Sequence, residues 1–480
     1  MLTRRAFIAG TTALALPRPA FAAAPSLTVA SRQIEVLGRA ATVYGITGAD
    51  GRQGHFAREG DRFAGGVLNR SGGDLILHWH GQVRAPADQD RTRPRGGMQA
   101  DGTTDSYDFA LTPGTHWMHS HTLTEQRLLA APMVTREADA MDPEATLMLH
   151  DFAFRSPEEI LAELGASKVH DMGAMAEGGT GADAGGEAAA HDMGAMDMGA
   201  MDMGAMDMGS TDMGSMGAGM VHANDVAYDA FLANDRTLDD PEVMAVGPGP
   251  FRLRIINGAT ASAFWIDTGA LRTEVVATDG APCQPRAGRF FPIAQGQRLD
   301  LMLQIPPEGG AFPVLAQVEG LRSRTGVILA TPGAAISRLS GEAEAAAPLT
   351  DLSLDAALAA TRPLADRPGR TLHVTLGMKP GYVWSLDSHG GLTGSVGERI
   401  EVMFMNPTPM MHPMHLHGHH FQVVDLGQGR FSGPMRDTVM VPPMGMVTVA
   451  VDLDKAGEWF LHCHHLYHMA GGMMTTLTVT

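Results

Sequence analysis

Cysteine is scarce in this sequence, whose 480 residues contain only Cys283 and Cys463. Two cysteines cannot supply the dense disulfide framework on which small secreted domains depend. Cys463 also lies between two histidines, a setting that calls for a free thiolate. Cys283, flanked by prolines in the run Ala-Pro-Cys-Gln-Pro, is expected to be a small buried residue in a strand bounded by turns. The sequence therefore predicts no disulfide.

Positive charge is also in short supply, because 35 lysines and arginines stand against 53 acidic residues, a net charge of −18. Nucleic acids and anionic membranes attract basic proteins, so neither is an expected partner. The excess of acid mildly favours a cationic substrate. A surface that keeps the protein soluble would explain the same charge.

The apolar run near the N-terminus, residues 6–16, is too short to span a bilayer. Arg4-Arg5 precede it, and Ala20-Phe21-Ala22 follow it as a small-x-small cleavage pattern. Residues 1–24 therefore look like a twin-arginine export signal, with an ordinary secretory signal as the alternative. Either signal predicts an exported, periplasmic protein without a membrane anchor in its mature form. We expect this protein to be a monomer.

Long amphipathic helices are few, and residues 157–164 form one short candidate. Short runs with period-two alternation dominate instead, separated by Gly, Pro, Asn and Asp, which is typical of β-sandwiches. Examples are residues 74–79, 251–256, 298–303, 400–404 and 447–451. The length and the 44% hydrophobic content suit several domains. We predict an all-β fold of three sandwich domains at 25–138, 143–335 and 366–480, with a connector at 334–370.

Residues 170–220 interrupt the second block with repeats of Asp-Met-Gly-Ala-Met. Glycine and aspartate at this density cannot build a core, so we expect disorder. Thioether sulfur is a soft ligand suited to Cu(I), and His170, His191 and His222 lie in or near the repeats. We interpret the segment as a place where additional Cu(I) is captured. A passive linker that grew by repeat expansion is the alternative.

Four histidine clusters lie in the first and third blocks. They are His78-Trp79-His80, His119-Ser120-His121, the run from His412 through His415 to His417, and His462-Cys463-His464 with His468 and Met473 following. Side chains alternate between the two faces of a strand, so Cys463 should point away from His462 and His464. A metal bound by Cys463 would thus be joined to metals bound by its neighbours through two short backbone paths. This arrangement suits electron transfer.

One metal site needs two imidazoles, a thiolate and a weak thioether, which is the blue-copper set. His412, Cys463, His468 and Met473 are the candidates for it. Zinc could use the first three, but it would leave the remaining eight histidines unexplained. Two copper ions with three imidazoles each and a third ion with two would use all eight. Four copper ions store four electrons, enough to reduce O2 to water.

These motifs, in their order and spacing, resemble those of the multicopper oxidases, which include laccases, ferroxidases and bacterial cuprous oxidases. The resemblance covers nearly the whole mature chain and implies three cupredoxin-like Greek-key domains, the middle one without copper ligands. It implies four copper ions, of which the type 1 ion would use His412, Cys463, His468 and Met473. The type 2 ion would use His78 and His415. The type 3 pair would use His80, His119 and His464 on one ion and His121, His417 and His462 on the other.

Reduction of O2 consumes protons, so an acid is expected near the cluster. Relatives often have an aspartate about nine residues after the second histidine of the first motif, where this chain has Gln89 between Asp88 and Asp90. We favour Asp90, with Asp88 as the second candidate for proton delivery. A solvated loop is the alternative for both. Relatives also often have an acid after the last type 1 histidine, where this chain has Met469.

The electron donor is predicted from methionines. Met410 matches a position two residues before His412 where cuprous oxidases place a methionine for substrate copper, although Thr408 replaces their nearby aspartate. The insert interrupts the second block, as in periplasmic copper-resistance proteins. We therefore expect oxidation of Cu(I) to Cu(II) with O2 as acceptor. A laccase that oxidises phenols or aromatic amines is the first alternative, which the 6% aromatic content supports little. A copper-sequestering protein is the second.

Overall fold

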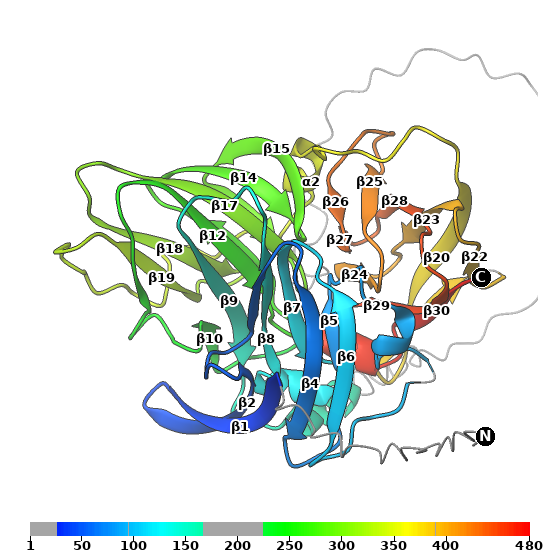
Figure 1. Ribbon diagram of the computed structural model, residues 1–480, viewed down its shortest axis with the longest axis horizontal. Helices are drawn as coiled ribbons and strands as arrows, with labels where there is room; N and C mark the ends of the chain where they lie inside the picture. The colour runs from blue at the N-terminus through cyan, green and yellow to red at the C-terminus, as the bar shows by residue number, and fades with distance from the viewer. Residues whose placement is uncertain (1–25, 95, 167–223, 389) are drawn as a thin grey trace, which may run out of the picture.

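The computed structural model describes residues 26–94, 96–166, 224–388 and 390–480. In these residues the chain forms six β-sheets, which pair into three sandwiches, and in Figure 1 the first sandwich lies below and between the second, at the left, and the third, at the right. The predicted all-β fold is confirmed. The expected signal at 1–24 and the methionine-rich segment at 170–220 lie outside the described residues. None of the described helices is long and apolar enough to cross a membrane.

The first sandwich pairs two four-stranded sheets. One has the order β2-β1-β4-β6, with β1 (Leu27–Val36), β2 (Arg39–Gly48), β4 (Arg62–Arg70) and β6 (Thr104–Ala110). The other has the order β3-β8-β7-β5, with β3 (His55–Arg58), β5 (Leu77–His80), β7 (Gly114–Ser120) and β8 (Ala130–Arg136). Buried Phe63, Trp79 and Phe109 pack in the core between them. Strand β5 lies at a sheet edge, so its two histidines are close to the outside of this sandwich.

The second sandwich pairs a six-stranded sheet with a five-stranded sheet. Its six-stranded sheet contains β9 (Glu144–Phe152), β10 (Ala230–Ala233), β12 (Gly249–Asn257), β14 (Arg272–Thr278), β15 (Ala281–Gly288) and β17 (Arg298–Ile305). Its five-stranded sheet contains β11 (Val243–Ala245), β13 (Phe264–Asp267), β16 (Phe290–Ile293), β18 (Ala311–Val318) and β19 (Arg324–Ala330). Cys283 is buried in β15 and is not part of a disulfide, as predicted.

The third sandwich follows a connector that holds the short helix α2 (Ser353–Ala357). One sheet contains β20 (Arg370–Lys379), β21 (Val383–Ser388), β23 (Arg399–Met405), β25 (Phe421–Asp425), β26 (Met435–Arg436) and β28 (Met446–Asp452). The other contains β22 (Leu392–Gly394), β24 (His412–Leu416), β27 (Thr438–Val441), β29 (Gly457–Cys463) and β30 (Met474–Val479). Helix α3 (Leu466–Ala470) follows β29.

The three sandwiches share one plan. In each, an early strand pairs in parallel with a later one, as in the pairs β1 with β4, β9 with β12, and β20 with β23. The other neighbours in these sheets are mainly antiparallel. Such crossed connections are typical of Greek-key sandwiches. The strands lie within residues 25–138, 143–335 and 366–480, and we propose these ranges as the domains.

The predicted helix near residue 157 is present and covers residues 157–166. It begins with a capping box, because Glu159 N donates to Ser156 Oγ and Ser156 N donates to the Glu159 carboxylate. Its buried Ile160 and Leu164 belong, with Val226, to the core of the third sandwich. The chain on both sides of residues 167–223 is therefore anchored against the third sandwich.

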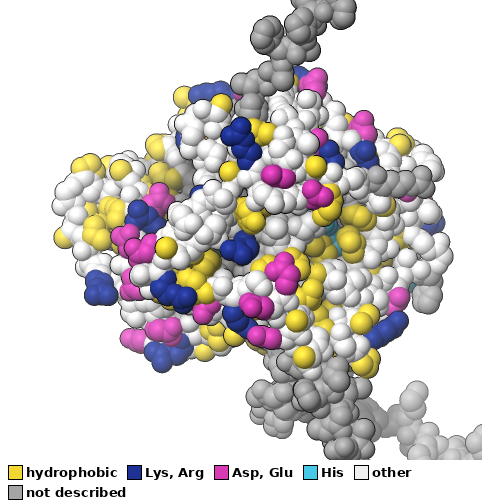
Figure 2. Space-filling view, turned by 90° about the horizontal axis from the view of Figure 1, so that it is seen from below, with side chains coloured by type: hydrophobic (Ala, Val, Ile, Leu, Met, Phe, Trp, Pro, Cys, Tyr) yellow, Lys and Arg dark blue, Asp and Glu magenta, His cyan; other side chains and the backbone are white. Residues whose placement is uncertain are grey.

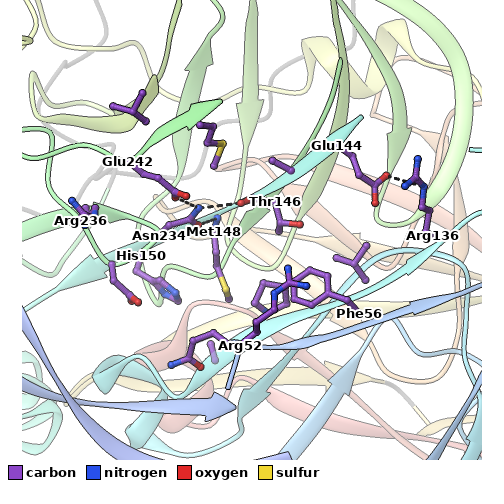
Figure 3. A pocket seen from close by; sticks show the side chains of 18 of the residues that line it. Arg52, Phe56, Arg136, Glu144, Thr146, Met148, His150, Asn234, Arg236 and Glu242 are labelled. Carbon is purple, nitrogen blue, oxygen red and sulfur yellow. Dashed lines mark hydrogen bonds and ion pairs between the residues drawn. The ribbon is translucent and has the colours of Figure 1, made fainter. Parts of the chain in front are cut away.

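A large cavity with a volume of about 1350 Å³ lies between the first and second sandwiches. Its wall mixes charges of both signs, including Arg52, Arg136, Glu144 and Glu242 (Figure 3). None of the predicted metal ligands is among its described lining residues. The candidate site therefore lies elsewhere.

Candidate metal centres

The first and third sandwiches each contribute a pair of strands that carry histidines at matching positions. His78 in β5 pairs with His119 in β7, and His415 in β24 pairs with His462 in β29. Residues paired across two strands point to the same face of a sheet. The register therefore gathers the histidines of each sandwich on one face. The close approach of rings across the interface shows that the two faces meet.

Ring nitrogens from the two sandwiches converge. His78 Nε2 lies 3.3 Å from His415 Nε2, and His462 Nε2 lies 3.2 Å from His121 Nε2 and 3.0 Å from His417 Nε2. Two nitrogens bound tetrahedrally at 2.0–2.1 Å to one metal ion would be about 3.3 Å apart. The spacing of the nitrogens therefore fits shared metal ions. His80, His119 and His464 form a further group whose ligand atoms lie within 4.8 Å of one another.

In five of these eight histidines the Nδ1 nitrogen meets an oxygen acceptor. Nδ1 of His78 and of His417 faces Asp90, that of His119 faces the Ser120 carbonyl, that of His415 faces the Asp437 carbonyl, and that of His462 faces the Cys463 carbonyl. An N–H donated at Nδ1 leaves the lone pair on Nε2. Such contacts fix the tautomer and the ring orientation that a metal ligand needs.

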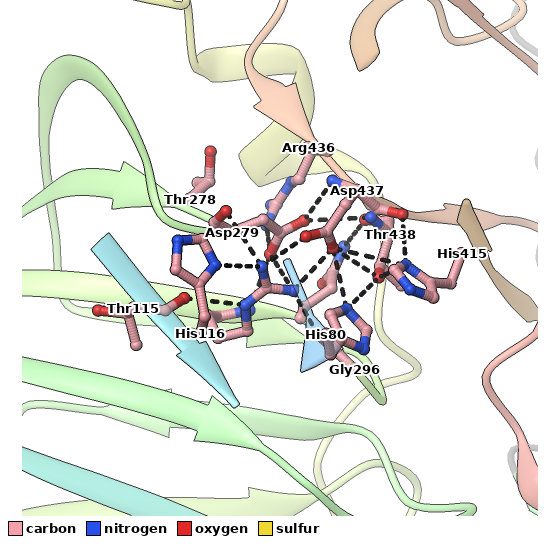
Figure 4. A network of polar contacts seen from close by, with 12 residues as sticks. His80, Thr115, His116, Thr278, Asp279, Gly296, His415, Arg436, Asp437 and Thr438 are labelled. Carbon is pink, nitrogen blue, oxygen red and sulfur yellow. Dashed lines mark hydrogen bonds and ion pairs between the residues drawn. The ribbon is translucent and has the colours of Figure 1, made fainter. Parts of the chain in front are cut away.

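His80 has the opposite arrangement. Its Nε2 lies 3.0 Å from Asp437 Oδ1, and its buried Nδ1 has no hydrogen-bond partner (Figure 4). His119 Nε2 and both ring nitrogens of His464 are also buried without a hydrogen-bond partner. Buried polar atoms are rarely left unpaired, since each costs about 1–3 kcal/mol. These three residues are the group that a further metal ion fits.

Burial keeps the imidazoles neutral. None of the eight is more than 8% exposed. Burial lowers the pKa of His119 and that of His462 to about 3. A neutral imidazole has the lone pair that a metal requires, and eight protonated rings in this space would repel one another. On the face drawn in Figure 2, little histidine surface is visible among the charged side chains.

The structure separates the two predicted acids. Asp90 is 6% exposed, and its Oδ2 lies 3.1 Å from His78 Nδ1 and 3.2 Å from His417 Nδ1. Burial alone would raise the pKa of Asp90, but contacts from both imidazoles hold it well below its usual range. Asp88 is exposed and lies in the short 3₁₀ helix Ala87–Gln89. The structure therefore brings Asp90, and not Asp88, to the histidines.

Cys463 belongs to a second centre. Its Sγ lies 3.7 Å from Nδ1 of His412 and 3.7 Å from Nδ1 of His468, and these two nitrogens are 3.1 Å apart. All three residues are fully buried. Burial raises the pKa of the Cys463 thiol, so a thiolate in this position needs a cation to stabilise it. Two imidazoles and one sulfur are suited to a soft metal ion such as copper.

The turn after α3 brings Met473 to this centre. Cys463 N donates to the Met473 carbonyl at 3.1 Å, and Met473 N donates to the His468 carbonyl at 2.9 Å. The Met473 side chain is fully buried in the same core as Cys463. Met410, the predicted substrate methionine, is 3% exposed in that core as well. The structure therefore does not present the Met410 thioether at the surface.

Sequence reasoning missed several charged residues that contact the centres. Asp437 faces His80, and Arg298 of the second sandwich holds Asp437. Glu125 Oε2 lies 3.1 Å from His119 Nδ1, and burial raises the pKa of Glu125 well above its ordinary value. Asp225 contacts His468. The Met-Arg-Asp-Thr run around Asp437 and the Glu125-Gln126 pair after the second histidine motif carried no distinguishing pattern.

Comparisons with known proteins agree with this chemistry. A family model described as multicopper oxidase matches residues 372–480. The chain is 29% identical over 452 residues to multicopper oxidase MmcO of Mycobacterium tuberculosis, covering 88% of this chain and 80% of that protein. It is 25% identical over 568 residues to a copper resistance protein A homolog of Pseudomonas syringae pv. tomato, covering 94% and 92%.

Solved structures show the same fold. The multicopper oxidase Fet3p superposes with a TM-score of 0.72 at 16% identity, covering 94% of this chain and 89% of that one. McoA from Aquifex aeolicus gives a TM-score of 0.65 at 21% identity and covers 95% of each chain. Residues 372–480 match the multicopper oxidase family, and the relatives and solved structures named here, which are similar to nearly the whole chain, are multicopper oxidases or a copper-resistance protein. The cupredoxin-like fold of these structures confirms the predicted fold class.

Proposed function

We propose that this protein oxidises Cu(I) to Cu(II) and reduces O2 to water, as a periplasmic enzyme of copper tolerance. The observation that carries the proposal is the contact between Asp225 and His468, because it puts a carboxylate beside a ligand of the sulfur-containing centre. A buried negative charge beside His468 favours a cationic electron donor over a neutral one.

The two groups of side chains described above would hold four copper ions. His412, Cys463, His468 and Met473 would hold the type 1 ion, and His78 with His415 the type 2 ion. The type 3 pair would take His80, His119 and His464 for one ion and His121, His417 and His462 for the other. Bound copper would supply one-electron oxidation at the first centre and four-electron reduction of O2 at the second. Peptide bonds join Cys463 to His462 and His464, so the centres share a short covalent path.

The surroundings of His468 support a cation in detail. Asp225 Oδ2 lies 3.7 Å from His468 Nε2, and Asp225 Oδ1 lies 3.2 Å from His465 Nε2. The His465 and His468 rings stack in parallel with centroids 3.7 Å apart. Burial opposes ionisation of Asp225, but the two histidines hold the pKa of Asp225 well below its ordinary value. Asp225 is therefore the acid best placed to attract Cu(I).

A second feature favours a soft cation on the side of His412. Thr408 Oγ1 lies 2.7 Å from His412 Nε2, and the Met444 amide is 3.4 Å from the Thr408 carbonyl. Met444 has a φ of 54° and is 76% exposed, so the turn whose main chain contacts Thr408 presents the Met444 side chain to solvent. Thioethers bind Cu(I) well. Met444 replaces Met410 as the methionine accessible to substrate.

The burial of both imidazoles argues against a laccase. His412 and His468 are fully buried, and Trp384 packs against His468 with centroids 4.0 Å apart. A phenol would need an open ring edge at one of these ligands. A laccase remains the alternative oxidase, and copper sequestration by residues 170–220 the alternative in a different class.

Asp90 is the proposed residue for proton delivery, because its buried carboxylate lies within hydrogen-bond distance of two rings of the eight-histidine cluster, those of His78 and His417. Reduction of O2 to water takes up protons, so an acid within hydrogen-bond reach of the cluster is required.

The proposal is tested by comparing turnover of Cu(I), Fe(II) and an uncharged phenol on fully copper-loaded protein. We expect Cu(I) to be preferred. Asp225→Asn should raise KM for Cu(I) and leave the phenol rate nearly unchanged, whereas Asp74→Asn, at an exposed acid, should affect neither. A phenol preference that persists in wild-type protein would contradict the proposal.

Deletion of residues 170–220 separates oxidation from sequestration. Unchanged Cu(I) turnover would exclude a catalytic role for this segment. Lost copper tolerance in cells, with full oxidase activity in the purified protein, would support sequestration instead.

A further inference from the structure

Asp437 contacts two histidines of the cluster through different atoms. Its Oδ1 accepts from His80 Nε2 at 3.0 Å, and its main-chain carbonyl accepts from His415 Nδ1 at 2.8 Å (Figure 4). His80 comes from the first sandwich and His415 from the third. Their rings stack with centroids 3.7 Å apart and an interplanar angle of 15°. One residue thus orients two imidazoles that belong to different sandwiches.

Arg298, from the second sandwich, holds the Asp437 carboxylate with both arms of its guanidinium. Nη1 donates to Oδ1 at 2.7 Å and Nη2 donates to Oδ2 at 2.5 Å. Paired contacts of this kind fix the plane of a carboxylate. The remaining donors of Arg298 go to the main-chain carbonyls of Thr115, Gly296 and Asp279 at 2.9–3.1 Å. Arg298 is fully buried, so this arrangement leaves its side chain no freedom to turn.

The ionised carboxylate decides which nitrogen of His80 can face a metal ion. An acceptor at Nε2 requires the proton to be on Nε2, which leaves the lone pair on Nδ1. Nδ1 is the nitrogen that is buried without a partner. In most of the other histidines of the cluster, Nε2 is the nitrogen that is free to bind a metal ion. The ring of His80 is turned the other way, so it needs a hydrogen-bond acceptor at Nε2 rather than at Nδ1.

We infer that Asp437, clamped by Arg298, is a positioning residue that makes His80 a ligand through Nδ1 and sets its orientation relative to His415. The inference rests on the proposed function, because it assumes that both histidines bind copper. It also gives the second sandwich a role in the reaction: this sandwich supplies none of the eight histidines, yet through Arg298 it reaches the cluster.

The first test is Asp437→Asn, with copper affinity measured by competition against a chelator. An amide directs N–H groups toward Arg298 or toward His80, so one of the two contacts must be lost. Loss of a residue that orients a metal ligand typically weakens metal binding or activity by about 10–100-fold. We expect that loss at the eight-histidine cluster, with altered electron paramagnetic resonance of its copper. The blue absorption should persist, because Cys463 contacts His412 and His468 and not Asp437.

Variants of Arg298 test whether the clamp acts through Asp437. Arg298→Lys keeps the charge but cannot grip both carboxylate oxygens. It should weaken copper binding at the cluster less than Arg298→Met does. The double variant with Asp437→Asn should be no worse than the more severe of the two single variants, as expected for residues that act as one unit.

Arg254→Met is the matched control. Arg254 is also fully buried, and it pairs with Asp300 at 3.0 Å and with Glu137 and Glu144 at the junction of the first two sandwiches. Its polar contacts do not include a histidine of the cluster. Losing this ion pair should lower the unfolding temperature but leave the affinity of the cluster for copper unchanged.

Three outcomes would overturn the inference. Wild-type copper affinity and resonance spectra in Asp437→Asn and Arg298→Lys would exclude a positioning role. Equal loss of cluster copper in Arg254→Met would mean that the effect follows from general loosening of the junction. Additive losses in the double variant would separate Arg298 from Asp437. His80→Ala tests the underlying assumption, because unchanged copper content there would contradict the proposed ligands rather than the clamp.

Discussion

His121 Nε2 and His462 Nε2 lie 3.2 Å apart, although 341 positions separate the two residues in the chain. His121 follows β7 of the first sandwich, and His462 lies in β29 of the third. Their contact means that the cluster exists only where the two sandwiches meet. Cys463, the next residue after His462, instead faces His412 and His468 within the third sandwich. The two centres can therefore be perturbed separately.

Cys463→Ser should abolish the blue absorption and turnover while leaving copper at the eight histidines. Serine removes the sulfur that lies 3.7 Å from Nδ1 of both His412 and His468. Visible spectra and the copper content per chain check this. Cys283→Ser is the control: Cys283 is buried in the second sandwich, where its Sγ lies 3.8 Å from the Val275 carbonyl, so the blue colour should remain. Blue absorption in Cys463→Ser would disprove the assignment.

Met473→Leu should raise the reduction potential of the blue copper, because a weak axial donor to Cu(II) is removed. The side chain is fully buried, and a methionine-to-leucine exchange in a core costs less than about 1.5 kcal/mol. A redox titration measures the potential. Met118→Leu, at a fully buried methionine of the first sandwich, should leave the potential unchanged. An unchanged potential in Met473→Leu would mean that the thioether is not a ligand.

Gly296→Ala should disturb the eight-histidine cluster from the second sandwich. A Cβ added at Gly296 would come within 2.5 Å of the His464 ring. The φ of Gly296 is 79°, which also strains any other residue. Gly333→Ala is a matched control, with a φ of 80° and nothing within 4 Å of the new atom. We expect cluster copper to fall only in Gly296→Ala; equal effects in both variants would attribute the change to backbone strain.

Glu319→Gln should stabilise the protein at pH 8 and not at pH 4. Burial raises the pKa of Glu319 to about 7 in the folded state from 4.5. The folded protein therefore binds more protons than the unfolded chain between these values, so stability falls as pH rises through them. A shift of this size corresponds to about 3 kcal/mol at most. Thermal unfolding at the two pH values measures the difference, and an equal effect at both would contradict this reasoning.

Short-range patterns predicted most of the fold and the histidines. Period-two alternation predicted strands that the structure has as β12, β17, β23 and β28. The spacing of the His-x-His and His-Cys-His motifs predicted which residues gather, because alternation along a strand fixes the face of each side chain. Patterns of this kind depend only on neighbours in the chain, so one sequence is enough to recognise them.

Residues that act through long-range contacts could not be predicted in this way. A lone aspartate such as Asp225 or Asp437 looks like any surface acid until the fold places it against a histidine. Arg298 is 139 positions from Asp437. Met410 matched, by its spacing from His412, the position of a substrate-binding methionine. Its side chain is nevertheless buried in the core of the third sandwich, where a substrate at the surface does not reach it. The choice between Asp88 and Asp90 also depended on which way a short loop turns.

The sequence by itself determined the chemistry: eight histidines, one cysteine between two of them, and strands that separate their faces. The tertiary structure decided how these groups are completed. It brought His121 into contact with His462, placed Asp225 beside His468, and paired Arg298 with Asp437. The physical reason is that strand periodicity is local, whereas burial, ion pairing and the convergence of ring nitrogens depend on how three sandwiches pack against one another.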